Sequence, residues 1–305
     1  MNVIESSGLG KCYHGTWALR DCTLAVPEGH MVALVGPNGA GKTTLLNLVV
    51  GLAAASAGKV TVLGGFDTGS LVALDGIAFV AQDTPLYKNL SVADMLHVTR
   101  NLNSRFDQRY AEVRLNELGV PLNRQVGNLS GGQQAQLALT LALSRRPRLL
   151  VMDEPMSSLD PLARHDFMAT VMTAMADDGV SVVLSSHVLA ELERVADFLV
   201  LLSLGSVQVA GEVEDLLAGH RVLTGPATEA DTFANRFGVV HATRGDAQAH
   251  LLVRTNGNTD PIPPGFEAHP VSLEELTLAY LRAPDVSWLP GPANARPAEA
   301  TEVAK

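Results

Sequence analysis

Two glycine-containing motifs constrain the fold of this chain more than any other feature of its sequence. The first, Gly36-Pro37-Asn38-Gly39-Ala40-Gly41-Lys42-Thr43, has the form GxxxxGK[ST] of a phosphate-binding loop and is called the phosphate loop below. The second, Leu129-Ser130-Gly131-Gly132-Gln133, is rare by chance and is called the signature motif. The apolar residues 30–35 predict a buried strand before the phosphate loop, and residues 43–50 predict a helix after it. This context predicts a P-loop α/β core.

The phosphate loop predicts its own chemistry. Glycine at positions 36, 39 and 41 permits positive φ and removes the Cβ that would separate the backbone from a ligand. Consecutive N–H groups then point at phosphate oxygens, and the start of the following helix adds its positive dipole end. We expect Lys42 to reach the β- and γ-phosphates and Thr43 to ligate Mg²⁺.

A pair of carboxylates follows a second apolar run. Residues 149–152 are Leu-Leu-Val-Met, which suits a central parallel strand, and Asp153 and Glu154 come next. We expect Asp153 to hold Mg²⁺ through a water molecule and Glu154 to polarise the attacking water as general base. Alone, such a run is more often a strand that ends in a solvated turn. The choice between the two is made by the family resemblance described next, whose motif order includes Ser130, Pro155 and Ser158-Leu159-Asp160.

In this order the motifs resemble the ATP-binding cassette of the ABC superfamily, over roughly residues 3–215. The resemblance implies ATP and Mg²⁺ as ligands. It gives catalytic roles to Lys42, Gln82, Glu154 and His187, and metal-binding roles to Thr43, Gln82 and Asp153. The resemblance implies that Tyr13 stacks on adenine. It also assigns ATP contacts to the phosphate loop and the residue after it, to the signature motif and to Asp160. These residues are Gly36, Pro37, Asn38, Gly39, Ala40, Gly41, Lys42, Thr43 and Thr44, then Ser130, Gly131, Gly132 and Gln133, and finally Asp160.

The sequence thus contains two helix starts that suit an anion, one after the phosphate loop and one at Ser130-Gly131-Gly132. The resemblance accounts for both, because in ABC ATPases the signature motif of one subunit faces the phosphate loop of another. It implies a dimer of two copies that encloses ATP, with Asp160 reaching toward the partner's site.

A few positions depart from the pattern usual in this family. Gln134 and Gln136 replace residues that are often basic, Met156 replaces a smaller or polar residue, and Asp83 stands where Glu is frequent. None of these changes removes the lysine, the two carboxylates, the glutamine or the histidine. We therefore expect an active ATPase.

Composition excludes other classes of protein. The net charge of −10 argues against a nucleic-acid-binding surface. Cys12 and Cys22 form no CxxC or Cys/His cluster, so neither a disulfide framework nor a zinc site is expected. The N-terminus lacks the pattern of a secretory signal and no run approaches about 18 apolar residues, so we expect a cytosolic chain without a membrane span. The family resemblance further implies a place on the cytoplasmic side of a bacterial cell membrane. The basic cluster at residues 145–148 is interpreted as a solvated helix end.

Gly, Pro and polar residues mark the predicted boundaries between the domains and elements of the chain. We expect an ABC-type domain over residues 1–219 with antiparallel strands at 3–26 and a helical subdomain at about 83–135. Helices are predicted to begin at Ser91, at Gln108, and after His187, the last with apolar residues at helical spacing as far as Leu199.

The character of the sequence changes from about residue 220. Residues 220–283 predict a small α+β domain, with strands at 221–224, 239–243 and 250–254. Helices are predicted at 228–237 and 272–282, the second with Ser272 and Glu275 as a capping box. Residues 284–305 are rich in Pro, Ala and Glu and predict a disordered tail.

Two classes of function remain open from the sequence. The first is the ATPase subunit of a membrane transporter, which needs a separate permease; export of a drug, antibiotic or lipid-like compound is favoured by resemblance over import. The stretch Tyr87–Val92 and the segment Ser272–Leu276 contribute to that preference. The second class is a soluble ABC ATPase that acts on DNA or ribosomes. Such proteins usually have two cassettes, a long coiled coil or zinc-binding cysteines, which this sequence lacks.

Overall fold

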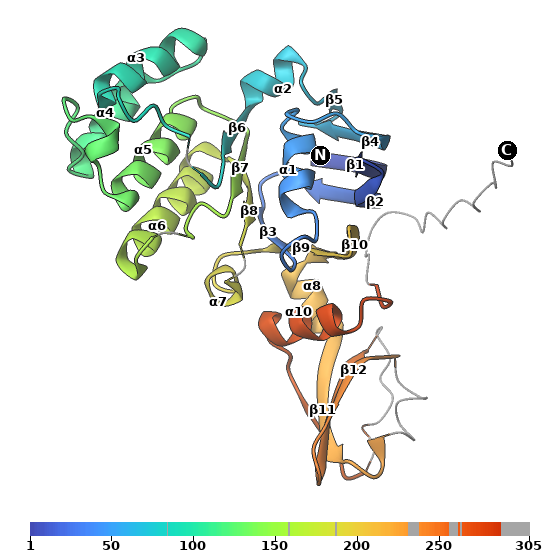
Figure 1. Ribbon diagram of the computed structural model, residues 1–305. Coiled ribbons are helices and arrows are strands. Elements are labelled where there is room, and N and C mark those ends of the chain that lie inside the picture. Colours follow the sequence, from blue (N-terminus) through green and yellow to red (C-terminus); the bar gives the residue numbers. More distant parts are fainter. Residues whose placement is uncertain are drawn as a thin grey trace, which may run out of the picture.

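The computed structural model of this chain describes residues 1–83, 85–157, 159–186, 188–230, 238–255, 262 and 264–287. Within them, three β-sheets and a set of helices are arranged as Figure 1 shows. The phosphate-loop and carboxylate segments belong to one central sheet, an antiparallel sheet lies beside it, and a third sheet lies at the C-terminal end. None of the described helices is both long and apolar enough to cross a membrane.

The central sheet has six strands in the order β10-β9-β3-β8-β7-β6. Their bounds are β3 Met31–Val35, β6 Ile77–Val80, β7 Leu149–Asp153, β8 Ser181–Ser185, β9 Phe198–Ser203 and β10 Ser206–Glu212. All neighbouring pairs are parallel except β9 and β10. Strands β3, β7, β8 and β9 are buried along their whole length, which is why they read as continuous apolar runs.

The N-terminal sheet is antiparallel, in the order β2-β1-β4-β5. Its strands are β1 Asn2–Tyr13, β2 Thr16–Pro27, β4 Ala57–Val62 and β5 Phe66–Asp67, so the strands predicted at 3–26 are confirmed. The helix α1 (Lys42–Val49) packs between this sheet and one face of the central sheet. The short helix α2 (Leu71–Gly76) precedes β6.

Helices α5 (Gly131–Leu143) and α6 (Pro161–Asp178) pack on the opposite face of the central sheet. Beside α5 lie α3 (Val92–Leu102), α4 (Gln108–Glu117) and the short 3₁₀ helix η1 (Val126–Asn128). Residues of β7 alternate between the two sides: Leu149 and Val151 pack with α1, whereas Leu150 and Met152 pack with α5 and α6. Helices α3, α4 and α5 also share a separate apolar core, which includes Leu96, Leu115 and Leu137.

The C-terminal region forms the small α+β domain predicted from the sequence. Its sheet has the order β12-β13-β11-β14, with β11 His220–Pro226, β12 Gly238–Arg244, β13 Gln248–Arg254 and β14 Glu267–His269. Helix α10 (Leu273–Arg282) begins with the predicted capping box of Ser272 and Glu275. Helix α8 (Val213–Ala218) leads from β10 into this domain.

Some predictions of local structure were wrong or are not tested. The helix predicted to run from residue 188 to Leu199 is wrong, because α7 covers only Leu189–Leu192 and Leu199 lies in β9, where it pairs with Ala33. Of the apolar residues with helical spacing, only Leu199 lies in β9, which begins at Phe198, so the spacing continues across the end of α7 into a separate strand. Most of the helix predicted at 228–237, and residues 288–305 of the predicted tail, lie outside the described residues.

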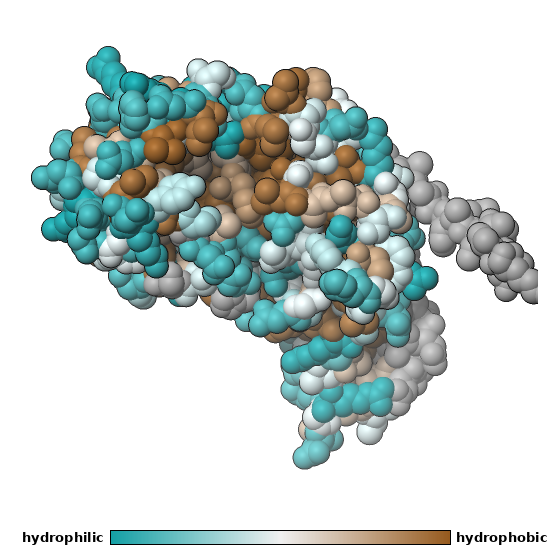
Figure 2. Space-filling model, turned by 45° about the horizontal axis from the view of Figure 1, so that its top comes forward, coloured by the Kyte–Doolittle hydropathy of each residue, from teal (hydrophilic) through white to brown (hydrophobic). Residues whose placement is uncertain are grey.

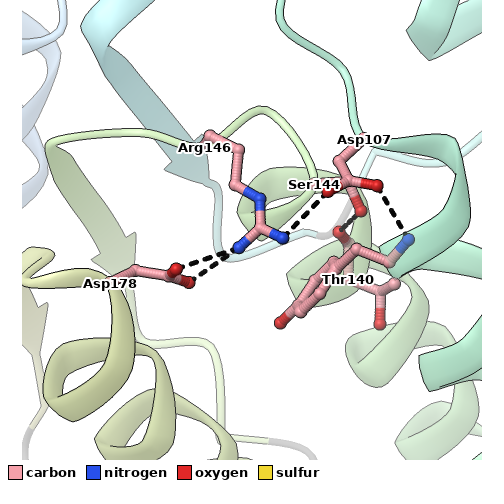
Figure 3. A network of polar contacts seen from close by, with 6 residues as sticks. Asp107, Thr140, Ser144, Arg146 and Asp178 are labelled. Carbon is pink, nitrogen blue, oxygen red and sulfur yellow. Dashed lines mark hydrogen bonds and ion pairs between the residues drawn. The ribbon is translucent and has the colours of Figure 1, made fainter.

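Arg146, predicted to be part of a solvated helix end, instead connects two parts of the protein. Figure 3 shows its guanidinium between two carboxylates, 2.9 Å from Asp107 at the start of α4 and 2.9 Å from Asp178 at the end of α6. It also lies over the Tyr110 ring, at 4.6 Å from the ring centre. The backbone N–H of Asp107 donates to Ser144 O, so the same network holds the end of α5.

Substitutions of Asp107 test the contribution of this network to stability. The Tyr110 N–H and the Arg146 guanidinium hold the pKa of Asp107 below its usual value. Asp107→Ala is expected to lower the free energy of unfolding by about 1 kcal/mol, since it removes a helix N-cap. Asp107→Asn keeps a cap and is expected to cost only the exposed ion pair, about 0.5 kcal/mol.

The pH dependence of the stability difference between wild type and Asp107→Ala serves as the control. A lowered pKa in the folded state means that the contribution of Asp107 is complete above the unfolded pKa of about 3.9 and is lost as pH falls through the folded pKa. The difference in unfolding free energy between wild type and Asp107→Ala, measured by urea denaturation, is therefore expected to be full at pH 7 and to shrink progressively as the pH falls below about 4. A difference that persists unchanged in acid contradicts the assignment.

Candidate functional site

The topology of the central sheet brings three segments of the site together. Strand β8 lies between β3 and β7, and all three run parallel. Their carboxyl ends therefore meet at one edge of the sheet, the usual place for a ligand in such folds. In the register, Ser185 of β8 is paired with Leu34 on one side and with Asp153 on the other. The phosphate loop follows β3 directly at this edge.

The phosphate loop requires glycine for lack of space as well as for conformation. A Cβ on Gly36 would collide with the backbone carbonyl of Leu202. Gly41 has φ 102° and forms the N-cap of α1, and a Cβ there would lie 2.6 Å from Leu19 Cδ2. Gly39 has open space around it, so its positive φ of 81° is the feature that favours glycine.

Lys42 is a buried cation at the start of α1, with 6% of its surface exposed. Its ammonium donates to Gly36 O at 2.8 Å and to Pro37 O at 3.4 Å. The carboxylate oxygen Glu154 Oε1 lies 3.8 Å from the ammonium nitrogen. A desolvated ammonium that faces neutral carbonyls and one carboxylate is a strong attractor for an anion. The geometry therefore suits a phosphate group at this loop.

The carboxylates Asp153 and Glu154 are held by a side chain that the sequence did not single out. The hydroxyl of Ser185 donates to Asp153 Oδ1 at 2.6 Å and accepts from the Glu154 N–H at 2.9 Å. Glu154 has φ 45°, a left-handed conformation that costs a residue with a Cβ about 1–2 kcal/mol. Ser185 lies within a predicted strand, and nothing in the apolar pattern marks a serine there as functional.

Other predicted residues lie at the periphery of this cluster. Tyr13 ends β1 and is half-exposed, with Lys11 Nζ 4.9 Å from its ring centre, so its flat face is not enclosed by the core. Gln82 is exposed just after β6, and Thr43 is exposed next to Lys42. These positions leave all three side chains accessible to a bound nucleotide.

The signature motif lies apart from the phosphate loop within one chain. Ser130 is exposed and caps α5, and its hydroxyl and the Gln133 side chain form a capping box. Asp160 caps α6 by accepting from the Ala163 N–H at 2.9 Å. A Cβ on Gly132 would lie 3.3 Å from the Ala163 Cβ, so these two helix starts are neighbours. Helices α5 and α1 pack on opposite faces of the central sheet.

His187 lies outside the described residues, but both of its neighbours are described. Ser186 is buried, and its hydroxyl accepts from the Val188 N–H at 3.0 Å. A small cavity at this point is lined by Glu154, Arg164, Ser186 and Val188, among others. The chain on both sides of residue 187 thus lies beside Glu154.

The residues present fit Mg²⁺ bound together with a nucleotide. Within the described part of the chain, no group of three or more His, Cys, Asp and Glu side chains is placed to hold a metal ion. Mg²⁺ does not need one, because it usually takes one or two protein ligands and completes its shell with phosphate oxygens and water. Asp153 and Thr43 supply oxygen ligands of that kind beside the phosphate loop.

Comparisons with known proteins agree with this geometry. Residues 19–157 match the family model described as "ABC transporter". The chain is 32% identical over 293 residues to the Fe(3+) ions import ATP-binding protein FbpC of Yersinia pestis. This alignment covers 92% of the chain and 81% of the relative. It is 32% identical over 224 residues to the Nod factor export ATP-binding protein I of Rhizobium johnstonii, covering 70% and 71% of the two chains.

Similarity to solved structures agrees with these sequence comparisons. The structure of an ATP-binding subunit of an ABC transporter superposes with a TM-score of 0.64 and 29% identity, over 71% of this chain and 92% of the other. A nucleotide-free ATP-binding cassette superposes with a TM-score of 0.61 and 26% identity, over 70% and 92%. The chain belongs to the ATP-binding proteins of the ABC transporter family. It is an ATPase whose hydrolysis is coupled to transport, the first of the two classes that the sequence left open.

Three substitutions test the roles of the charged groups. Lys42→Ala is expected to abolish ATP hydrolysis and weaken nucleotide binding, because the phosphates lose a buried ammonium partner. Asp153→Asn is expected to weaken Mg²⁺ binding. Glu154→Gln is expected to leave ATP binding intact and to slow hydrolysis by at least about 100-fold, the usual scale of general-base loss.

These outcomes are measured by release of phosphate and by fluorescence titration with a labelled ATP analogue across a range of Mg²⁺ concentrations. Equal loss of nucleotide affinity in Asp153→Asn and Glu154→Gln would show that the two carboxylates are misassigned.

Proposed function

We propose that two copies of this chain enclose two ATP molecules, each bound between the phosphate loop of one copy and the signature motif of the other. The observation that carries this proposal is the placement of helices α1 and α5 on opposite faces of the central sheet, with Thr43 exposed in the first turn of α1 and Ser130 exposed at the start of α5. A single copy cannot apply both helix starts to one nucleotide, whereas a two-fold pair presents each to the other. Asp160, next to the signature motif, then lies at the same interface.

Within each proposed ATP site, the side chains have separate roles. Lys42 neutralises the phosphate oxygens, and Glu154 accepts a proton from the attacking water. Gln82 and His187 contact the water and the γ-phosphate, and Tyr13 stacks on the adenine. Asp153 and Thr43 hold Mg²⁺, which when bound withdraws charge from the phosphate oxygens. The left-handed Glu154 backbone, held by Ser185, aims the general base toward the Lys42 side of the site.

A membrane permease is the proposed partner, and an apolar groove is its proposed docking place. The groove runs between β6 and α5 and is lined by Phe79, Pro85, Leu86, Ala138 and Leu141. Figure 2 shows apolar residues gathered on this side of the protein, where the surface is hollowed. Gln82 lies on the segment that borders the groove, so a partner seated there would touch the residue that contacts the reacting water.

The proposed direction of transport is export of a drug, antibiotic or lipid-like compound. Support comes from the resemblance of the Tyr87–Val92 and Ser272–Leu276 segments to export ATPases and from the similarity to the Nod factor export protein. Import is the second candidate. It is favoured by the similarity to the iron-import protein, which extends over 92% of this chain.

Direction can be tested in inverted membrane vesicles that contain the chain and its permease. With ATP outside, we expect uptake of a fluorescent amphipathic dye into the lumen, and no uptake when Glu154→Gln replaces the wild type. An importer gives the opposite result: no dye uptake in vesicles, and ⁵⁵Fe(3+) accumulation in intact cells that depends on Glu154.

The dimer can be tested with the same variant. Glu154→Gln is expected to accumulate a two-copy complex at saturating Mg-ATP, because ATP binds the closed state preferentially and hydrolysis no longer opens it. Adding Ser130→Arg to Glu154→Gln should abolish this complex without preventing ATP binding to the phosphate loop. Light scattering with and without Mg-ATP measures both. A Glu154→Gln protein that stays monomeric with ATP, alone and with its permease, contradicts the enclosed-ATP arrangement.

A further inference from the structure

The end of strand β1 is fixed to the loop that follows α1. The N–H of Ser56 donates to Gly10 O at 2.8 Å, and the N–H of Cys12 donates to the Ser56 hydroxyl at 3.1 Å. A third bond comes from a lysine side chain, because the ammonium of Lys11 donates to Ala54 O at 2.7 Å. Side-chain and backbone bonds thus hold the end of β1 on this loop.

The same strand end lies beside the phosphate loop. In the pairing of β1 with β2, Lys11 is opposite Leu19. A Cβ on Gly41, the N-cap of α1, would lie 2.6 Å from Leu19 Cδ2 and 2.7 Å from Ala18 O. Strand β2 therefore lies against the residue that precedes Lys42, and Figure 1 shows α1 beside these strands. The fold thus sets a fixed spacing between the end of β1 and the phosphate loop.

The ammonium of Lys11 has a second partner, the ring of Tyr13. Its Nζ lies 4.9 Å from the ring centre, within the range at which a cation is attracted to the face of an aromatic ring. Tyr13 is the last residue of β1, and 43% of it is exposed. An exposed side chain must be ordered before it can stack on a flat ligand, and that ordering weakens binding. The contact with Lys11 favours one orientation of the ring in advance.

We propose that Lys11 is a positioning residue for the base of the nucleotide. It holds the Tyr13 ring at a fixed place relative to the phosphate loop, so that the base stacks on the ring while the phosphates lie at Lys42. Because pre-organisation reduces the cost of binding, Lys11 contributes to the affinity for ATP and not to the chemical step. This proposal rests on the role of Tyr13 in the proposed function.

Substitution of Lys11 tests the proposal. Lys11→Met keeps an apolar stem without the ammonium and is expected to raise KM and Kd for ATP about two- to fivefold, the scale of one exposed cation–π contact, with kcat unchanged. Inorganic triphosphate, which has the phosphates but no base, is expected to compete with unchanged affinity. Lys11→Arg keeps a cation that stacks on aromatic rings and is expected to restore most of the affinity. Lys59→Met is the matched control, because it removes an exposed ammonium from the neighbouring strand β4, where Lys59 pairs with Asp67 at 3.1 Å.

A Tyr13→Ala background separates positioning of the ring from a direct attraction between Lys11 and the phosphates. In Tyr13→Ala, the change Lys11→Met is expected to cause no further loss of ATP affinity, because there is no longer a ring to position. An equal loss in both backgrounds overturns the proposal, as does weaker binding of inorganic triphosphate or an unchanged KM in Lys11→Met. If Tyr13→Ala itself binds ATP as tightly as the wild type, the role of Tyr13 in the proposed function fails, and this result is distinct from a failure at Lys11 alone.

Discussion

The hydroxyl of Ser185 makes the two hydrogen bonds on which the geometry of the active centre depends. It donates to Asp153 Oδ1 and accepts the N–H of Glu154, so one side chain orients one carboxylate and supports the left-handed backbone of the other. This is possible because β8 lies between β3 and β7 in a parallel sheet, and its last residue is level with Asp153. Glu154 can then lie 3.8 Å from the Lys42 ammonium on the neighbouring loop.

The second constraint is the separation of the two anion-binding helix starts. Residues of the buried strands alternate between a core shared with α1 and a core shared with α5 and α6, so the phosphate loop and the signature motif cannot meet within one chain. In the proposed arrangement, dimer formation is therefore part of the chemistry. The C-terminal domain is joined to the ATPase domain at both ends of α10, whose first turn donates to Glu193 and whose last turn is bound by Gln208 of β10.

Much of the fold and of the candidate site could be predicted from the sequence, because the informative signals are local. The phosphate loop between a buried strand and a helix, the run before Asp153, and the capping boxes at Ser91, Ser130 and Ser272 all lie within a few residues of what they specify. The rest depends on contacts between distant segments. Ser185 gains its role only from strand pairing, and Arg146 gains its role from two acidic residues on other helices. The helix predicted through Leu199 failed because apolar residues at helical spacing continue past the end of α7 at Leu192 into β9, and periodicity alone does not show where the helix ends.

The composite site is the central claim, and complementation between two inactive variants tests it most directly. Lys42→Ala lacks a working phosphate loop but has an intact signature motif, and Ser130→Arg has the reverse. In a mixed pair, one of the two sites combines the intact phosphate loop of Ser130→Arg with the intact signature motif of Lys42→Ala. We predict that mixing the two proteins restores ATP hydrolysis well above the sum of the separate rates, up to about half of the wild-type rate per pair. Hydrolysis that stays at the sum of the two separate rates at every mixing ratio, although mixed pairs form, would contradict the account.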